Sequence, residues 1–113
     1  EIESIINKSV AYSKKKLDNN KVNYHVLGDG STIINQMPLP YTQITNFQKV
    51  FLLTDSKYYK MINLQGFSKA DVLKYASLLN LKVEIKGNGY VTRQSIPSGT
   101  ILNEKHLLKI YLN

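Results

Sequence analysis

Residues 81–89 read LKVEIKGNG and residues 22–30 read VNYHVLGDG, so one pattern occurs twice at an offset of 59 residues. In each copy apolar and polar side chains alternate until the chain reaches two glycines separated by one residue. Alternation with a period of two is typical of a strand with one buried face, and closely spaced glycines are typical of a turn. The repeat therefore predicts two copies of one small structural unit.

A helix is predicted before each of these strands, over about residues 10–19 and 69–79. Each segment follows a serine, Ser9 or Ser68, whose hydroxyl can accept a hydrogen bond from a backbone N–H of the first turn. Asp71 lies three residues after Ser68 and completes a capping-box pattern. The second helix also has an apolar face that can cover a sheet, formed by Val72, Ala76 and Leu79.

After the glycines both copies continue to a glutamine, Gln36 or Gln94, then to a turn with proline, and then to a closing strand over residues 49–54 or 107–112. From the glutamine onward the offset is 58 residues, and a surface loop tolerates such a one-residue difference easily. Each unit is interpreted as a short leading strand, a helix and two or three antiparallel strands. The predicted fold class is α+β, with one helix packed on a small antiparallel three-stranded sheet in each unit.

Two domains are predicted, over residues 1–55 and 61–113, and residues 56–60 are interpreted as a linker. The linker has two adjacent tyrosines and no glycine or proline, which favours a short ordered connection. Units of this size have little interior, and the chain has no cysteine, so burial of apolar side chains must stabilise them. Hydrophobic residues make up 42% of the chain, which is enough for packed cores.

Charge and hydropathy limit the classes of function. The net charge is +7, and Arg93 is the only arginine beside 14 lysines, a balance that attracts polyanions over long range. The densest run, residues 14–16, is interpreted as the solvated face of the first helix. Nucleic-acid binding is compatible with a pI of about 9.6, but no nucleic-acid-binding motif is recognised. The sequence has no run of 18 apolar residues, so no signal or transmembrane segment is identified.

The ordered series of elements resembles the PASTA family, which consists of small modules in the extracytoplasmic parts of penicillin-binding proteins and receptor-type Ser/Thr kinases of Gram-positive bacteria. The resemblance covers nearly the whole chain. In the second copy it rests on a leading segment, a strand, a Gly-x-Gly turn, a Gln-Ser pair and a Gly-Thr turn, at residues 61–68, 81–85, 87–89, 94–95 and 99–100. It implies two tandem modules, with no catalytic machinery of their own.

Both copies depart from the family pattern in places. Glu3 and Asn7 stand where the family often has proline and glycine, and Ile62 replaces the leading proline of the second copy. Tyr41 replaces the glycine that is equivalent to Gly99. If that turn requires a positive φ, a tyrosine is costly there, so we expect the first copy to use a different turn.

The resemblance also indicates a parent protein. Two modules at a C-terminal end resemble the class B penicillin-binding proteins of division or sporulation, transpeptidases that cross-link peptidoglycan. Residues 52–55, LLTD, are similar to a stretch of division transpeptidases. The implied parent is a D,D-transpeptidase held at the cell surface by an N-terminal membrane helix. The alternative is the muropeptide-sensing extracellular region of a receptor Ser/Thr kinase, for which three or more modules after one membrane helix are typical.

The sequence predicts no enzyme active site. Ser13 and Lys16 have the Ser-x-x-Lys spacing of a transpeptidase nucleophile and its lysine, but the Ser-x-Asn and Lys-Thr-Gly motifs that complete such a site do not occur. The two histidines, His25 and His106, have no carboxylate at the spacing of a metal site or of a general base. His25 is interpreted as an exposed strand residue. Neither a metal nor a cofactor is expected.

Binding of a cell-wall ligand is the predicted function of the surface. The candidate ligand-binding residues are Asn88, Tyr90, Arg93 and Gln94, with Gln36 as the counterpart in the first copy. They are chosen because alternation places them outside, and because an arginine can hold a carboxylate with two hydrogen bonds. The expected partners are peptidoglycan or muropeptide, the parent's own transpeptidase domain and divisome proteins. Neither specific nucleic-acid binding nor membrane insertion is expected.

Overall fold

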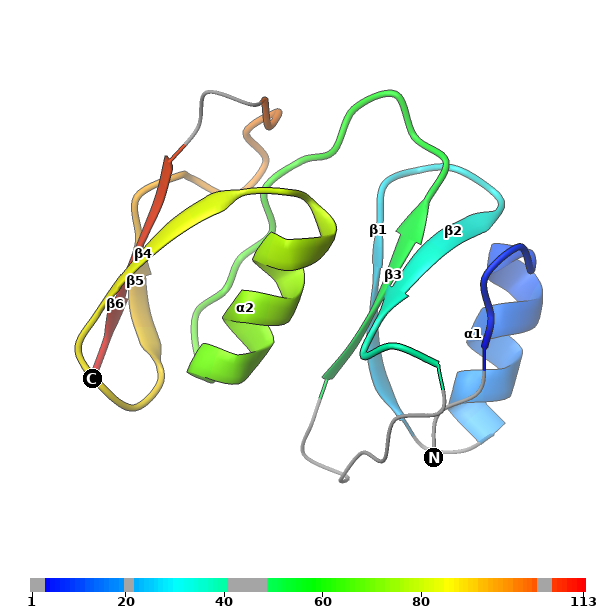
Figure 1. Ribbon diagram of the computed structural model, residues 1–113, viewed down its shortest axis with the longest axis horizontal. Coiled ribbons are helices and arrows are strands. Elements are labelled where there is room, and N and C mark those ends of the chain that lie inside the picture. The colour runs from blue at the N-terminus through cyan, green and yellow to red at the C-terminus, as the bar shows by residue number, and fades with distance from the viewer. Residues whose placement is uncertain (1–3, 20–21, 41–48, 104–106) are drawn as a thin grey trace. The chain divides into compact units, whose positions relative to one another are not determined.

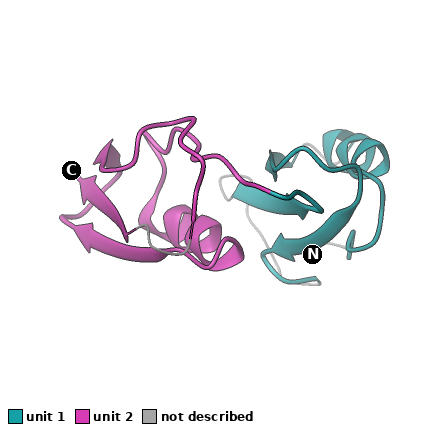
Figure 2. Cartoon of the chain, turned by 90° about the horizontal axis from the view of Figure 1, so that it is seen from above, with its two compact units in different colours: residues 1–57 teal, residues 58–113 magenta. Residues whose placement is uncertain are grey.

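The computed structural model of the chain describes residues 4–19, 22–40, 49–103 and 107–113 (Figure 1). Contacts divide the chain into two compact units, residues 1–57 (unit 1) and residues 58–113 (unit 2) (Figure 2). The elements of unit 1 are α1 (Val10–Asn19), β1 (Asn23–Leu27), β2 (Ile33–Met37) and β3 (Lys49–Thr54). Those of unit 2 are α2 (Lys69–Leu78), β4 (Lys82–Lys86), β5 (Val91–Gln94) and β6 (Leu107–Leu112).

Both predicted helices are present, and the serine before each one caps its N-terminus. The Ser9 hydroxyl accepts a hydrogen bond from the Tyr12 N–H at 3.1 Å, and the Ser68 hydroxyl accepts one from the Asp71 N–H at 3.2 Å. These bonds satisfy N–H groups that have no partner within the first helical turn. The serine caps predicted for the two helix starts are therefore confirmed.

The sheet of each unit is mixed, which corrects the prediction of a wholly antiparallel sheet. The strand orders are β1-β3-β2 and β4-β6-β5, so the last strand of each unit lies in the centre. It runs parallel to the first strand and antiparallel to the second. The glycine turn reverses the chain, but the two strands that it joins lie on opposite sides of the central strand and form no hairpin. In β3 the apolar run of residues 50–53 is typical of a central strand that is covered on both faces.

In unit 1, α1 packs on the sheet through side chains from every element of the unit. Leu17 lies against the side of the sheet that carries Val50 and Leu52, and Ile33 and Ile5 complete this cluster. Ser13 is also fully buried on α1, and its hydroxyl donates to the Ser9 carbonyl at 2.9 Å, so its polar group is satisfied.

In unit 2, the corresponding core lies between α2 and the inner face of the sheet. Its fully or nearly fully buried side chains include Val72, Tyr75 and Ala76 from α2, and Leu108 and Ile110 from the central strand. Figure 1 shows α2 beside its sheet, and α2 contacts the β4 edge. Val83 and Ile85 of β4 are partly buried, and they alternate with exposed lysine and glutamate side chains. The alternation in the sequence therefore predicts the two faces of β4 correctly.

Two equivalent positions before the helices have positive φ, although only one is a glycine. Asn7 has a φ of 70° and Gly66 has a φ of 85°. Asparagine is one of the side chains that tolerates the left-handed region best, so Asn7 replaces the expected glycine without a change of backbone. Gly99 also has a positive φ, of 92°. Its counterpart Tyr41 lies outside the described residues, so the expected different turn stays a prediction.

We predict that the Gly89→Ala substitution destabilises unit 2 by about 1 to 2 kcal/mol. Gly89 has a φ of 105°, and a Cβ there would lie 2.6 Å from the Asn113 carbonyl oxygen. Gly66→Ala is the matched control, since Gly66 has a φ of 85° but no atom within 4 Å of the added Cβ. Urea denaturation of both variants would measure the difference. Equal losses of stability in the two variants would show that the contact between the added Cβ and the Asn113 carbonyl oxygen has no cost beyond that of the positive φ.

Candidate functional site

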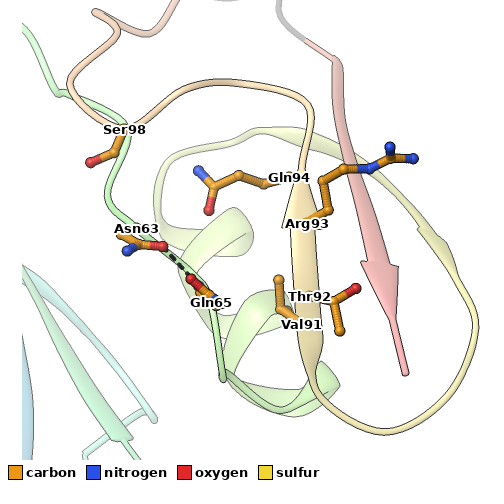
Figure 3. A pocket seen from close by; sticks show the side chains of 7 residues that line it. All are labelled: Asn63, Gln65, Val91, Thr92, Arg93, Gln94 and Ser98. Atoms are coloured by element: carbon orange, nitrogen blue, oxygen red, sulfur yellow. Dashed lines mark hydrogen bonds between the residues drawn. The ribbon is translucent and has the colours of Figure 1, made fainter.

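A pocket of about 300 Å³ opens beside β5 in unit 2 (Figure 3). Three parts of the sequence form it: the segment before α2, the strand β5, and the turn that follows β5. Its lining residues are Asn63, Gln65, Val91, Thr92, Arg93, Gln94 and Ser98. Most of these side chains are polar, so the pocket suits a ligand with many hydrogen-bonding groups.

Gln94 connects the walls of this pocket. Its amide nitrogen donates to the carbonyl of Ile62 at 3.0 Å and to that of Ile96 at 2.8 Å. Its amide oxygen accepts from the Leu64 N–H at 2.8 Å. The side chain therefore ties the segment before α2 to the turn after β5, and these bonds leave little of its amide for a ligand.

The remaining polar groups come from residues that the sequence analysis missed. Asn63 accepts a hydrogen bond from the Gln65 N–H at 3.0 Å, a local turn that brings both amide side chains to the pocket (Figure 3). Ser98 and Thr92 add hydroxyl groups, which donate to the carbonyls of Met61 at 3.5 Å and of Tyr111 at 3.1 Å. These four residues follow no common spacing, so the sequence carries no signal that brings them together.

Arg93 points to the other side of β5. In Figure 3 its side chain extends over β6, away from Gln94. Its guanidinium carbon lies 4.2 Å from the centroid of the Tyr111 ring, a cation–π contact. Stacking uses the flat face of a guanidinium, while the N–H groups lie in its plane and can still bind a carboxylate or a phosphate. Arg93 therefore lines the pocket only through its inner part and places its charge on the outer side of the sheet.

Comparison with known proteins identifies the family of this unit. Residues 59–113 match the family model of the PASTA domain. This part of the chain is a PASTA domain. No curated protein sequence matches the chain. The expected resemblance of the second copy is therefore confirmed, and the pocket beside β5 lies in this PASTA domain.

Among solved structures, penicillin-binding protein 2X from Streptococcus thermophilus is similar over 98% of this chain, with a TM-score of 0.84 and 26% sequence identity. The chain spans 16% of that protein. Two Ser/Thr kinase structures from Staphylococcus aureus have TM-scores of 0.40. The three-PASTA-domain structure is 20% identical, and the match covers 96% of this chain and 63% of the other chain. The structure of the entire extracellular region is 19% identical, and the match covers 100% of this chain and 46% of the other chain.

Two of the predicted ligand-binding residues lie outside the pocket of the PASTA domain. Asn88 is exposed in the Gly-Asn-Gly turn, and Tyr90 is 61% exposed just before β5. The backbone N–H and carbonyl of Tyr90 pair with Asn113 at 3.3 and 2.9 Å. The structure therefore brings Arg93 and Gln94 to the pocket but not Asn88 or Tyr90, whose binding of a ligand stays a prediction.

Gln36 occupies the position in unit 1 that Gln94 occupies in the PASTA domain, but it is fully buried. Its amide oxygen accepts from the Ile5 N–H at 2.8 Å, and its amide nitrogen donates to the Pro38 carbonyl at 3.3 Å. A ligand cannot reach this side chain in the folded unit, so the predicted ligand contact at Gln36 does not fit the structure. Its geometry indicates a structural role.

The remaining candidates from the sequence are the two histidines. His25 is half-buried, with its ring stacked on Phe51 at a centroid distance of 5.5 Å, so its interpretation as an exposed residue is wrong. His106 lies outside the described residues. Within those residues no group of three His, Asp or Glu side chains could hold a metal ion. Over the same ranges, none of the helices has the length and apolar character needed to cross a membrane.

Proposed function

We propose that this chain is a non-catalytic, extracytoplasmic part of a penicillin-binding protein and helps to position that peptidoglycan transpeptidase at the cell wall or division site. The observation that carries the proposal is the structural likeness to penicillin-binding protein 2X, with a TM-score of 0.84 over 98% of this chain. The parent would be a Gram-positive D,D-transpeptidase of division or sporulation, held in the membrane by an N-terminal helix. Its own catalytic domain and divisome proteins would be further partners.

The tandem arrangement supports the same proposal. Unit 1 has the strand order of the PASTA domain, the same pattern of parallel and antiparallel pairs, and a glutamine at the equivalent position of its second strand. We therefore propose that unit 1 is a second PASTA module. The division of the chain between residues 57 and 58 lies within the predicted linker, and Tyr59 and Lys60 pair with Leu102 and Ile101 inside unit 2.

Weak binding of a muropeptide in the pocket beside β5 is the proposed means of positioning. A muropeptide carries amide, hydroxyl and carboxylate groups. The amides of Asn63 and Gln65 offer both donors and acceptors, and the hydroxyl oxygens of Thr92 and Ser98 offer acceptors. A carboxylate of the stem peptide that passed over the β5 edge would reach the N–H groups of Arg93. An open polar pocket of this kind favours weak binding, which is sufficient for a module that acts beside a membrane-held enzyme.

We predict that Gln65→Ala weakens muropeptide binding at least about threefold, because it removes one hydrogen-bonding group of the pocket. Titration of the ¹⁵N-labelled chain with purified muropeptide would measure the dissociation constant and locate the shifts, which we expect at Asn63, Gln65, Thr92 and Ser98. Ser77→Ala, in an exposed position of α2, is the control and should bind as the unchanged chain does. A β-lactam serves as a second ligand. Absence of localised shifts at millimolar muropeptide would contradict the proposal.

A further inference from the structure

The outer face of the PASTA domain sheet carries most of the charged strand residues of unit 2. We define this outer face by Lys82, Glu84, Lys86, Arg93, Lys109 and Tyr111. Strand register brings them together, since Lys86 and Arg93 both pair with Tyr111 on the central strand, and Glu84 pairs with Lys109. Alternation turns the same side of each strand outward, and all six are exposed except Tyr111, which is half-buried.

The outer face is strongly basic. Among the described residues that define it, four are cations and one, Glu84, is an acid. Glu84 neutralises little of this charge. Its carboxylate is 3.7 Å from the Lys86 ammonium, and both side chains are about half exposed, so the pair is weak and screened. The lysines and the arginine therefore present a nearly uncompensated positive patch to solvent.

The fold does not require this charge, because unit 1 has the same sheet without it. At the equivalent positions unit 1 has buried Leu27, Phe51 and Leu53 in place of Lys86, Lys109 and Tyr111, and it has half-buried His25 in place of Glu84. The central strand of the PASTA domain thus differs from its counterpart in carrying one cation, Lys109, outward, and the strands beside it carry the other three. A feature present in only one of two copies of a fold points to a function of that copy's surface.

We propose that the outer face binds a linear polyol-phosphate polymer, at a surface that meets the muropeptide pocket only at Arg93. Neighbouring strands lie about 4.8 Å apart, so the backbones of Lys86 and Arg93 are separated by about 10 Å across Tyr111, and successive rows along a strand by about 7 Å. Cations at these spacings can meet successive phosphates of one extended chain. Lysine ammonium groups act as point charges for phosphate and need no fixed orientation of the ligand.

The same geometry disfavours nucleic acid as the ligand. Recognition of single strands without sequence preference combines a basic surface with aromatic rings on which bases stack. Among the residues of the outer face, Tyr111 is the aromatic one, and the Arg93 guanidinium already lies over its ring at 4.2 Å. A phosphodiester polymer without bases needs no aromatic ring to stack on, so the contact between Arg93 and Tyr111 does not weaken its binding. The binding should therefore depend on phosphate and not on the bases.

Binding to purified poly(glycerol phosphate), measured by calorimetry, would test the proposal with the whole chain. If about three phosphates are bound, we expect the dissociation constant to rise about 20-fold between about 50 and 200 mM salt. The variant with Lys82→Gln, Lys86→Gln and Lys109→Gln should bind at least about tenfold more weakly and lose most of this salt dependence. A ¹H–¹⁵N spectrum would establish that the triple variant is folded.

The matched control is a second triple variant, with residues 14, 15 and 16 of α1 changed from Lys to Gln, because it loses the same charge from a solvated helix. It should bind the polymer nearly as well as the unchanged chain. Equal losses in the two variants would overturn the proposal and indicate general charge attraction. Tighter binding of oligothymidylate than of poly(glycerol phosphate) would also overturn it. Gln65→Ala should leave polymer binding unchanged, so failure of the muropeptide proposal would not affect this test.

Discussion

Replacement of Gln36 by alanine is expected to unfold most of unit 1. The substitution removes the bonds to the Ile5 N–H and the Pro38 carbonyl, which would be left buried without these partners. Each such group costs about 1 to 3 kcal/mol, and the cavity left by the side chain adds to the loss. We expect a total loss of about 3 to 5 kcal/mol. This is most of the stability that a unit of this size has.

Two further variants separate the causes of this loss. Gln36→Met keeps most of the volume but none of the hydrogen bonds, so it should cost nearly as much as alanine if the bonds dominate. Gln94→Ala makes the same change in unit 2, where the side chain is partly exposed and water can replace its bonds, so a smaller loss is expected. Urea denaturation followed through ¹H–¹⁵N signals of each unit would measure all three. A loss below about 1 kcal/mol for Gln36→Ala would contradict a structural role.

The two glutamines also show where sequence reasoning stops. Their repetition was visible, and the helices and strands around them lie where the patterns predicted. The direction in which their side chains point could not be predicted from the sequence. The reason is that the strand pairing shifts register between Val91 and Arg93, and in unit 1 between Ile33 and Asn35. A bulge adds a residue to one strand and reverses the alternation after it. Gln94 therefore turns toward the segment before α2, while its neighbour Arg93 turns outward.

The strand pairing and the pocket could not be predicted from the sequence, for a related reason. Alternation in Lys82–Lys86 indicates one buried face but not the neighbouring strand, so a parallel pair with β6 could not be told from an antiparallel hairpin. Only the apolar run of β3 gave a signal for a central strand, and the corresponding strand β6 alternates. The pocket combines Asn63, Thr92 and Ser98 from separate segments, and no spacing along the chain records that they meet.

The buried tyrosine of α2 is expected to make the PASTA domain sensitive to alkaline pH. Burial raises the pKa of Tyr75 to about 12, and the hydrogen bond from the Ile62 N–H to its hydroxyl lowers the pKa only in part. An exposed tyrosine in the unfolded chain has a pKa of about 10. Between these values the folded domain keeps the proton and the unfolded chain loses it. The stabilisation is therefore complete below about pH 10 and is lost as the pH rises toward 12.

The expected loss is about 2 to 3 kcal/mol, since each unit of pKa difference corresponds to about 1.4 kcal/mol. Tyr75→Phe removes this titration and keeps the ring, which is fully buried in the core. At pH 8 the variant should lose little, because the contacts of the hydroxyl to the Ile62 nitrogen, at 3.4 Å, and to the Met61 sulfur, at 3.8 Å, are long. Urea denaturation at pH 8 and at about pH 11.5 would compare the two proteins. All other side chains are the same in the two proteins, so their contributions cancel in the comparison. If both proteins lost the same stability between the two pH values, ionisation of Tyr75 would not be the cause. A smaller loss in Tyr75→Phe would show that the unchanged domain is destabilised because the Tyr75 phenol ionises in the unfolded chain.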